Sequence, residues 1–224
     1  MAARLKLSIV MPVLNEAERI GAALQALAPL RRDGCEVIVV DGGSADRTRE
    51  LAEPLCDRVV SSARGRALQM NAGARHATGD TLLFLHADTR LPPDGEIFMR
   101  DALTRHLWGR FDVEIEGRHR LLKVVGCAMN LRSRLSGIAT GDQAIFVRRD
   151  AFPGFPPIAL MEDIAFSREM KRRGAPACLR ERVRTSGRRW EKRGVLRTVV
   201  LMWRLRLLYY FGAPPDRLAR LYEP

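Results

Sequence analysis

Short apolar runs separated by stretches of helical period occupy the first 90 residues. The apolar runs are residues 7–13, 36–40, 59–61 and 81–85. Between them the spacing predicts helices over residues 15–30 and 66–76, and a third helix opening at Ser44 as N-cap. Strands without alternation that are separated by helices are typical of a parallel sheet buried on both faces. The chain is therefore predicted to have an α/β fold.

Beyond residue 91 the pattern is less regular. It predicts a helix to about Leu107, an edge strand, a strand over residues 145–147 and a helix over residues 162–173. The expected edge strand carries alternating apolar residues, namely Phe111, Val113 and Ile115.

Residues 194–211 predict a long apolar helix. It is too short and too charged to span a bilayer, because Arg197, Arg204 and Arg206 fall within it. We expect it to pack on the body of the protein through Val199, Met202, Trp203 and Leu207. The alternative is that it lies on an anionic membrane surface.

Three of the predicted strands end in polar or acidic residues. The first leads into Asn15 and Glu16, the second into Asp41, and the fourth into His86 and Asp88. Ligands of open α/β sheets bind beyond the carboxyl ends of the strands. A carboxylate there suits Mg²⁺ or Mn²⁺, which takes one or two protein carboxylates and completes its shell with water and phosphate oxygens. The alternative is that Asp88 only caps a turn.

Glycines and arginines near these strand ends favour a phosphate-bearing ligand. Gly42 and Gly43 would let a ligand approach the backbone, and Arg64 and Arg66 could make bidentate contacts to a diphosphate. The sequence has neither a Gly-x-Gly-x-x-Gly dinucleotide fingerprint nor a P-loop.

A chain of 224 residues suits one compact unit. Its charge and its cysteine content add two further expectations. The net charge is +12, and residues 164–224 hold 16 Lys and Arg against 5 Asp and Glu. This basic region predicts contact with an anionic surface or substrate, or it is an ordinary solvated face. The four cysteines lack metal-ligand spacing and are expected to be buried free thiols.

Four segments, in their order and spacing, resemble a family 2 glycosyltransferase of the GT-A fold. They are residues 8–16, 39–48, 66–73 and 84–88. The resemblance implies a Rossmann-like, mostly parallel sheet flanked by helices, with a GT-A domain over residues 1–190. Residues 191–224 would then be a basic amphipathic C-terminal helical extension. Within the family the chain is similar to a small soluble subgroup associated with arsenosugar biosynthesis.

The resemblance also implies a site for a nucleotide-sugar donor. Asp41 would accept the N–H of a uracil-type base, which favours a UDP-sugar. The residues expected at the donor are Pro12, Asn15, Glu16, Asp41, Gly43, Arg64, Arg66 and Ala87.

Two positions depart from the commonest family pattern. Asp88 matches the last acid of the Asp-x-Asp metal motif, but His86 stands in place of the first. Either Asp88 binds the metal together with water and diphosphate, or Mn²⁺ is preferred to Mg²⁺. The second acid of the usual Asp-Asp-Gly-Ser is Gly42.

Downstream residues resemble the family's acceptor and catalytic segments. Asp163 is the expected catalytic base with Glu162 in reserve, and the alternative is an acid that only complements the helix dipole. The acceptor and the diphosphate are expected at Gly141, Asp142, Arg189 and Trp190. Ser186 replaces the Gln of the motif of processive synthases, which favours a single transfer.

The sequence therefore predicts an inverting, metal-dependent glycosyltransferase that acts on a hydroxyl of a small molecule or lipid. One alternative is a sugar-phosphate nucleotidyltransferase, which would need a glycine-rich loop where residues 14–16 stand. Another is a non-catalytic protein that binds nucleic acid or an anionic surface, although few aromatics interleave with the basic residues. The start of the chain predicts a strand rather than a signal peptide, and hence a cytoplasmic protein. The alternative is a cytoplasmic protein that is peripheral on the inner face of the membrane.

Overall fold

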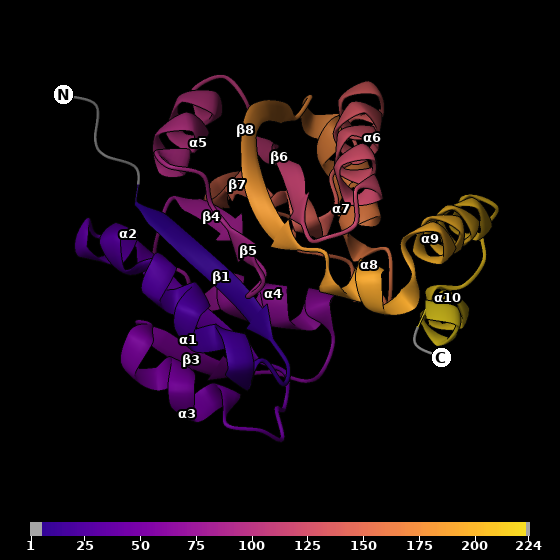
Figure 1. The fold of residues 1–224 in the computed structure, drawn as a ribbon. Coiled ribbons are helices and arrows are strands. Elements are labelled where there is room, and N and C mark those ends of the chain that lie inside the picture. The colour runs from indigo at the N-terminus through magenta and orange to yellow at the C-terminus, as the bar shows by residue number, and fades with distance from the viewer. Residues whose placement is uncertain (1–5, 223–224) are drawn as a thin grey trace.

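The protein forms one eight-stranded mixed sheet flanked by helices in a computed structural model that describes residues 6–222 (Figure 1). The order of the strands across the sheet is β3-β2-β1-β4-β7-β6-β8-β5. Their bounds are β1 Leu7–Val13, β2 Glu36–Asp41, β3 Arg58–Ser61, β4 Thr81–Phe84, β5 Thr89–Arg90, β6 Trp108–Glu116, β7 Phe146–Arg148 and β8 Ala177–Ser186. The predicted α/β class is confirmed.

Ten α-helices are found within the described residues. They are α1 Ala17–Ala26, α2 Ala28–Arg32, α3 Thr48–Ala52, α4 Arg66–His76, α5 Gly95–Leu103, α6 Leu121–Ser136, α7 Glu162–Arg173, α8 Arg188–Arg193, α9 Val195–Tyr210 and α10 Pro215–Tyr222. None of the helices described is long and apolar enough to cross a membrane. The expectation about a signal peptide rests partly on residues 1–5, which lie outside the described residues.

Strand direction divides the sheet into two parts. β3, β2, β1 and β4 run parallel, whereas β7 is antiparallel to both β4 and β6. β6 and β8 are again parallel to each other. The parallel part holds the three predicted polar strand ends side by side, because β1 lies between β2 and β4.

Three strands of the parallel part, β1, β2 and β4, are buried on both faces, which explains their continuous apolar sequence. Along β1, Ile9 and Met11 belong to one core cluster and Val10 to the other. The first cluster includes Ile20 of α1, and the second includes Met70 of α4. The period of two in the strand thus sends successive side chains to opposite helix layers.

The helix predicted over residues 15–30 is instead two helices, α1 and α2. The break lies at Leu27, whose N–H donates to the Leu24 carbonyl at 3.0 Å rather than continuing the regular ladder. Pro29, at the second position of α2, has no N–H to bond back to α1. A short second helix is therefore the favourable continuation.

Ser44 is not the N-cap of the following helix, so this prediction is wrong. α3 begins at Thr48, and Asp46 accepts the backbone N–H of Thr48 at 3.0 Å. Ser44 donates its hydroxyl to the Asp41 carboxylate instead. The serine is held by the turn that follows β2.

The expected edge strand around Phe111 is an interior strand, β6. It lies between β7 and β8, and β8 was not predicted. Arginines and glutamate alternate with buried Val183 and Thr185 along β8, so its sequence lacks an apolar run. The 16-residue α6 was also missed.

The C-terminal helices α8, α9 and α10 lie at one end of the molecule, next to α6 (Figure 1). α9 packs through Val195, Thr198 and Leu205, which are buried. The predicted contacts of Trp203 and Leu207 are wrong, since these residues are 73% and 58% exposed. The boundary expected between residues 190 and 191 stays a prediction.

The cysteines are free thiols, as expected, but they are not all buried. Cys35 and Cys56 are buried, Cys178 is half-buried and Cys127 is exposed. Burial raises the pKa of the Cys56 thiol, which keeps it protonated at neutral pH.

Because α4 packs closely on the sheet, we predict that Gly→Ala substitutions in α4 and in α1 change the free energy of unfolding in opposite directions. A Cβ on Gly73 would lie 2.3 Å from Cγ1 of Val10, so Gly73→Ala should lower the free energy of unfolding by about 1–3 kcal/mol. On α1, a Cβ on Gly21 has nothing within 4 Å, and Gly21→Ala should raise it by about 0.5–1 kcal/mol. Urea denaturation of both variants measures this difference, and equal effects would contradict the packing.

Candidate functional site

The turn after β2 is organised around the Asp41 carboxylate. Asp41 is buried and accepts the N–H groups of Gly43 at 3.3 Å and Ser44 at 3.2 Å, together with the Ser44 hydroxyl. Gly43 has a φ of 90°, which a residue with a Cβ rarely adopts. The turn fixes the carboxylate at the edge of the sheet.

The loop after β1 is held against this turn. Asn15, with a φ of 53°, accepts the N–H of Ala45 on its side-chain oxygen at 2.9 Å. The backbone N–H of Asn15 donates to the Ser44 hydroxyl, also at 2.9 Å. Two of the predicted strand-end segments therefore meet.

The other residues expected at the nucleotide-sugar donor differ in how exposed their side chains are. The Glu16 carboxylate lies 2.7 Å from the Arg19 guanidinium, so its charge is already paired. Pro12 is half-buried, Ala87 is buried and Arg64 is exposed.

Gln69 was not predicted, although it ties the two strand ends together. Its buried amide nitrogen on α4 donates to the carbonyls of Val13 at 2.8 Å and Val40 at 2.9 Å. A Cβ on Gly42 would lie 2.9 Å from this amide. Gly42, the departure from the family pattern, leaves the space that Gln69 occupies.

A cavity of about 870 Å³ lies beside the sheet and receives most of the remaining candidates. The predicted residues that line it are Arg66, His86, Gly141, Asp142, Glu162, Asp163, Arg189 and Trp190. They come from α4, the end of β4, the loop before β7, the start of α7 and α8. Residues nearly 125 positions apart in sequence thus share one space.

Asp163 has a fixed orientation at the start of α7. One carboxylate oxygen accepts the N–H of Gly141 at 3.1 Å, and the other accepts the N–H of Ile164 at 2.7 Å. Met161 precedes the pair with a φ of 73°, a conformation that turns the chain sharply into the helix. The predicted acceptor loop and the predicted base are therefore in direct contact.

Glu162 is almost fully buried, with 5% of its surface exposed. Burial, and next the negative charge of Asp163, raise the pKa of the Glu162 carboxyl to about 7, against the positive charges of Arg66 and His86. A carboxyl with a pKa near neutrality can either give or take a proton at working pH.

His86 faces the acceptor loop. Its Nδ1 lies 3.7 Å from the Asp142 carboxylate, and a Cβ on Gly141 would lie 2.7 Å from the imidazole ring. Burial opposes ionisation of Asp142, but the hydrogen bond and charge of His86, with Arg66 and Arg189, lower the pKa of the Asp142 carboxyl. Only a glycine at 141 leaves room for this ring.

Asp88 is exposed just beyond β4, and among the described residues its carboxylate accepts only the Thr89 hydroxyl, at 3.3 Å. Among residues 6–222 no group of three His, Cys, Asp or Glu side chains could hold a metal ion. One free hard carboxylate fits Mg²⁺ or Mn²⁺ that takes its other ligands from a diphosphate and water.

Arg189 and Trp190 form the cavity wall on α8. The Arg189 guanidinium donates to the phenolic oxygen of Tyr222 and lies over its ring at 5.8 Å. Trp190 is half-buried and also packs on the main core. Tyr222 of α10 lines the cavity and was not predicted.

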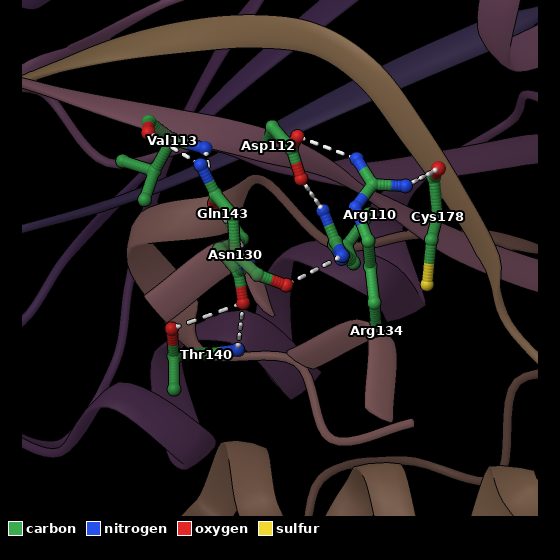
Figure 2. A network of polar contacts seen from close by, with 8 residues as sticks. All are labelled: Arg110, Asp112, Val113, Asn130, Arg134, Thr140, Gln143 and Cys178. Carbon is green, nitrogen blue, oxygen red and sulfur yellow. Dashed lines mark hydrogen bonds and ion pairs between the residues drawn. The ribbon is translucent and has the colours of Figure 1, made fainter. Parts of the chain in front are cut away.

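A buried polar network supports the acceptor loop (Figure 2). The Asn130 side chain of α6 exchanges hydrogen bonds with the Val113 backbone of β6, at 2.8 and 2.9 Å. Gln143 donates to Asn130 at 3.4 Å and accepts the Thr140 N–H at 3.2 Å. Nearby, Arg110 and Arg134 both donate to the Asp112 carboxylate (Figure 2). The loop that carries Gly141 is thereby fixed to α6 and β6.

Comparisons with known proteins show what parts of the chain are similar to. Residues 8–99 match the family model described as "Glycosyl transferase family 2". Proteins named "PGL/p-HBAD biosynthesis glycosyltransferase" from Mycobacterium bovis and Mycobacterium tuberculosis are 38% identical over 91 residues, 38% of this chain. The match spans about a third, 36%, of the length of these curated relatives.

Solved structures are similar over more of the chain. Glucosyl-3-phosphoglycerate synthase from Mycobacterium tuberculosis, in complex with Mn²⁺, UDP and glucosyl-3-phosphoglycerate, has a TM-score of 0.67 at 22% identity and covers 95% of this chain and 82% of its own. The same enzyme with Mg²⁺ and UDP has a TM-score of 0.61 at 21% identity, covering 82% and 71%. Staphylococcus aureus TarS, residues 1–349, has a TM-score of 0.64 at 17% identity, covering 82% and 61%. At these identities the likeness shows the GT-A fold.

The contact between Gly42 and Gln69 predicts an energetic coupling. Gly42→Ala should lower the free energy of unfolding by about 1–3 kcal/mol, because its methyl group displaces an amide that satisfies two buried carbonyls. In a Gln69→Ala background the same substitution should cost about 1 kcal/mol less. Urea denaturation of the four proteins measures the coupling. Gly21→Ala in both backgrounds is the control, and additive effects at residue 42 would contradict the contact.

The raised pKa of Glu162 predicts that stability falls as pH rises through a defined window. Below about pH 4.5 the carboxyl is protonated in both states, whereas between pH 4.5 and 7 only the unfolded chain releases the proton. Glu162→Gln should therefore increase the free energy of unfolding at pH 8, on the order of 2 kcal/mol, and much less at pH 4.5.

The matched control is Glu169→Gln on the exposed side of α7. Hydrogen bonds from Arg172 and then Arg173 lower the pKa of the Glu169 carboxyl, so this substitution should not stabilise the protein at pH 8. A stability gain for Glu162→Gln that did not change between pH 4.5 and 8 would argue against a raised pKa.

Proposed function

We propose that this chain, whose residues 8–99 match the model of glycosyltransferase family 2, transfers a sugar from a nucleotide diphosphate to an acceptor hydroxyl, with inversion at the anomeric carbon. The observation that carries the proposal is the contact between Asp163 and Gly141. It puts an oriented carboxylate and the acceptor loop in one cavity beside the strand ends of the family module.

The donor lies at the edge formed by the loops after β1 and β2. Asp41 retains acceptor capacity beyond its contacts within the turn, because a carboxylate has about four lone-pair positions. It would accept the N–H of uracil. Two solved structures of similar fold contain UDP, one with Mn²⁺ and one with Mg²⁺, which supports a UDP-sugar donor and a divalent cation.

Asp88 would hold that cation, because its carboxylate is exposed and, within the described part of the chain, is contacted only by the Thr89 hydroxyl. His86, the second metal candidate, is turned to Asp142, so its part in this structure is to position the acceptor loop. When bound, Mn²⁺ or Mg²⁺ neutralises charge on the diphosphate leaving group.

Arg66 and Arg189 line the cavity from opposite elements, α4 and α8. Guanidinium groups bind phosphate oxygens in pairs of hydrogen bonds, so these two are assigned to the diphosphate. To bind the diphosphate, the Arg189 guanidinium would have to give up its hydrogen bond to the Tyr222 phenolic oxygen. Trp190, in the adjacent wall, would contact the acceptor.

Asp163 acts as the base that takes the proton from the acceptor hydroxyl. Its two backbone hydrogen bonds hold the carboxylate in one orientation, which general base catalysis requires. Glu162 is the reserve base. The anomeric configuration of the product, read from proton couplings, tests the assignment, because retention of configuration would exclude a single displacement assisted by Asp163.

Binding measurements test the donor site before any acceptor is known. Titration calorimetry with UDP and GDP, each with and without Mn²⁺, should show Mn²⁺-dependent UDP binding. Asp88→Asn should weaken that binding at least tenfold and leave thermal unfolding within about 2 °C, because an exposed carboxylate contributes little to the core.

Asp101→Asn, an exposed aspartate on α5, is the matched control and should bind UDP as the unchanged protein does. No UDP or GDP binding under either condition would overturn the transferase proposal. UDP binding that was equally tight without Mn²⁺ and unaffected by Asp88→Asn would overturn the metal assignment.

A further inference from the structure

Two arginines that line the cavity have no role in the transfer described above. Arg132 lies on α6 and Arg206 on α9, and both line the cavity with Asp163. Two guanidinium nitrogens of Arg132, Nε and Nη2, are buried and have no hydrogen-bond partner among the residues that the structure describes. Its third nitrogen, Nη1, reaches the Ile138 carbonyl only at 3.5 Å. Neither arginine forms an ion pair within residues 6–222.

The two positive charges influence each other. Burial and then the charge of Arg206 lower the pKa of Arg132 to about 10, and burial lowers the pKa of Arg206 as well. Both groups remain protonated at neutral pH. Paired guanidinium groups with unused donors in a sheltered site match the geometry and charge of a phosphate.

Asp163 relates the charges of Arg132 and Arg206 to the proposed chemistry. Its carboxylate raises the pKa of both Arg132 and Arg206, which shows that the pair lies within electrostatic range of the candidate base. Arg66 and Arg189 reach the cavity from α4 and α8 instead. The cavity is therefore lined by a second pair of arginines, which come from α6 and α9 rather than from α4 and α8.

The wall beyond the two arginines is apolar and open. The lining includes Leu131 and Leu135 of α6, and Leu196 and Trp203 of α9, all of them exposed. Leu135 is 80% and Trp203 73% exposed. α6 and α9 lie next to each other at the right of the molecule (Figure 1). Large apolar side chains beside a half-buried cationic pair are suited to a ligand with both characters.

We infer that the acceptor is an amphipathic phosphate, with its phosphate between Arg132 and Arg206 and its hydrocarbon body along the facing sides of α6 and α9. This rests on the proposed function, because it specifies the acceptor of that transfer. Continuity of one cavity from Asp163 to Leu135 carries the assignment, since a single molecule can reach both ends.

Alkyl phosphates are the probes that test it. Hexyl, octyl and decyl phosphate, each below its micelle concentration, are titrated by calorimetry against inorganic phosphate and decanol. Affinity should rise about two- to fourfold for each added methylene, and decanol should bind at least tenfold more weakly than decyl phosphate. Inorganic phosphate binding as tightly as decyl phosphate would overturn the inference in favour of a small phosphorylated acceptor.

Matched substitutions locate the binding. Arg132→Gln and Arg206→Gln should each weaken decyl phosphate at least tenfold, whereas Arg204→Gln, exposed on α9 and outside the cavity lining, should not. Trp203→Ser should reduce the gain per methylene, and Val200→Ser, an exposed apolar control on α9, should leave it unchanged. Equal weakening by the control variants would indicate non-specific adsorption and overturn the assignment.

Donor titrations separate this inference from the proposed function. Arg132→Gln and Arg206→Gln should retain Mn²⁺-dependent UDP binding, which also shows that they are folded. Intact UDP binding without alkyl phosphate binding would overturn the acceptor assignment alone. Alkyl phosphate binding with the expected variant effects, but without UDP binding, would support the amphiphile site and overturn the transferase.

Discussion

The amide side chain of Asn130 holds together three segments on which the acceptor side of the protein depends. It pairs with the backbone of Val113 in β6, belongs to α6, and accepts a hydrogen bond from Gln143 in the acceptor loop. Buried amides must find partners, so each of these segments is constrained by the other two. Gly141 can then present its N–H to Asp163, and α6 is fixed as one wall of the cavity.

The donor side depends on a second buried amide, that of Gln69. It satisfies the carbonyls at the ends of β1 and β2, where the loops bearing Asn15 and Asp41 begin. Two hydrogen bonds join these loops to each other. The Ser44 hydroxyl accepts the Asn15 N–H, and the Asn15 side-chain oxygen accepts the Ala45 N–H. Each half of the site is thus placed by one α-helical amide, from α4 or from α6, and the cavity lies where the halves meet.

The arginines that line the cavity come from different helices. Arg66 and Arg189 approach from α4 and α8, while Arg132 and Arg206 approach from α6 and α9. Asp163 lies within electrostatic range of Arg66, Arg132 and Arg206. Two substrates would match this arrangement, a donor that carries a diphosphate and an acceptor that carries a phosphate. The carboxylates of α7 would then lie between the two anionic groups.

The sequence determined the elements whose signals are local. Continuous apolar runs predicted β1, β2 and β4, helical spacing predicted α4 and α7, and the order of motifs indicated the family whose model residues 8–99 match. The tertiary structure decided what depends on distant partners. β8 has an arginine-rich sequence and forms only because β6 offers a parallel neighbour, and Ser44 serves Asp41 rather than a helix. Likewise Gln69, Asn130 and the pair of Arg132 and Arg206 carry no signal in isolation, since burial and the groups across the fold give a polar side chain its role.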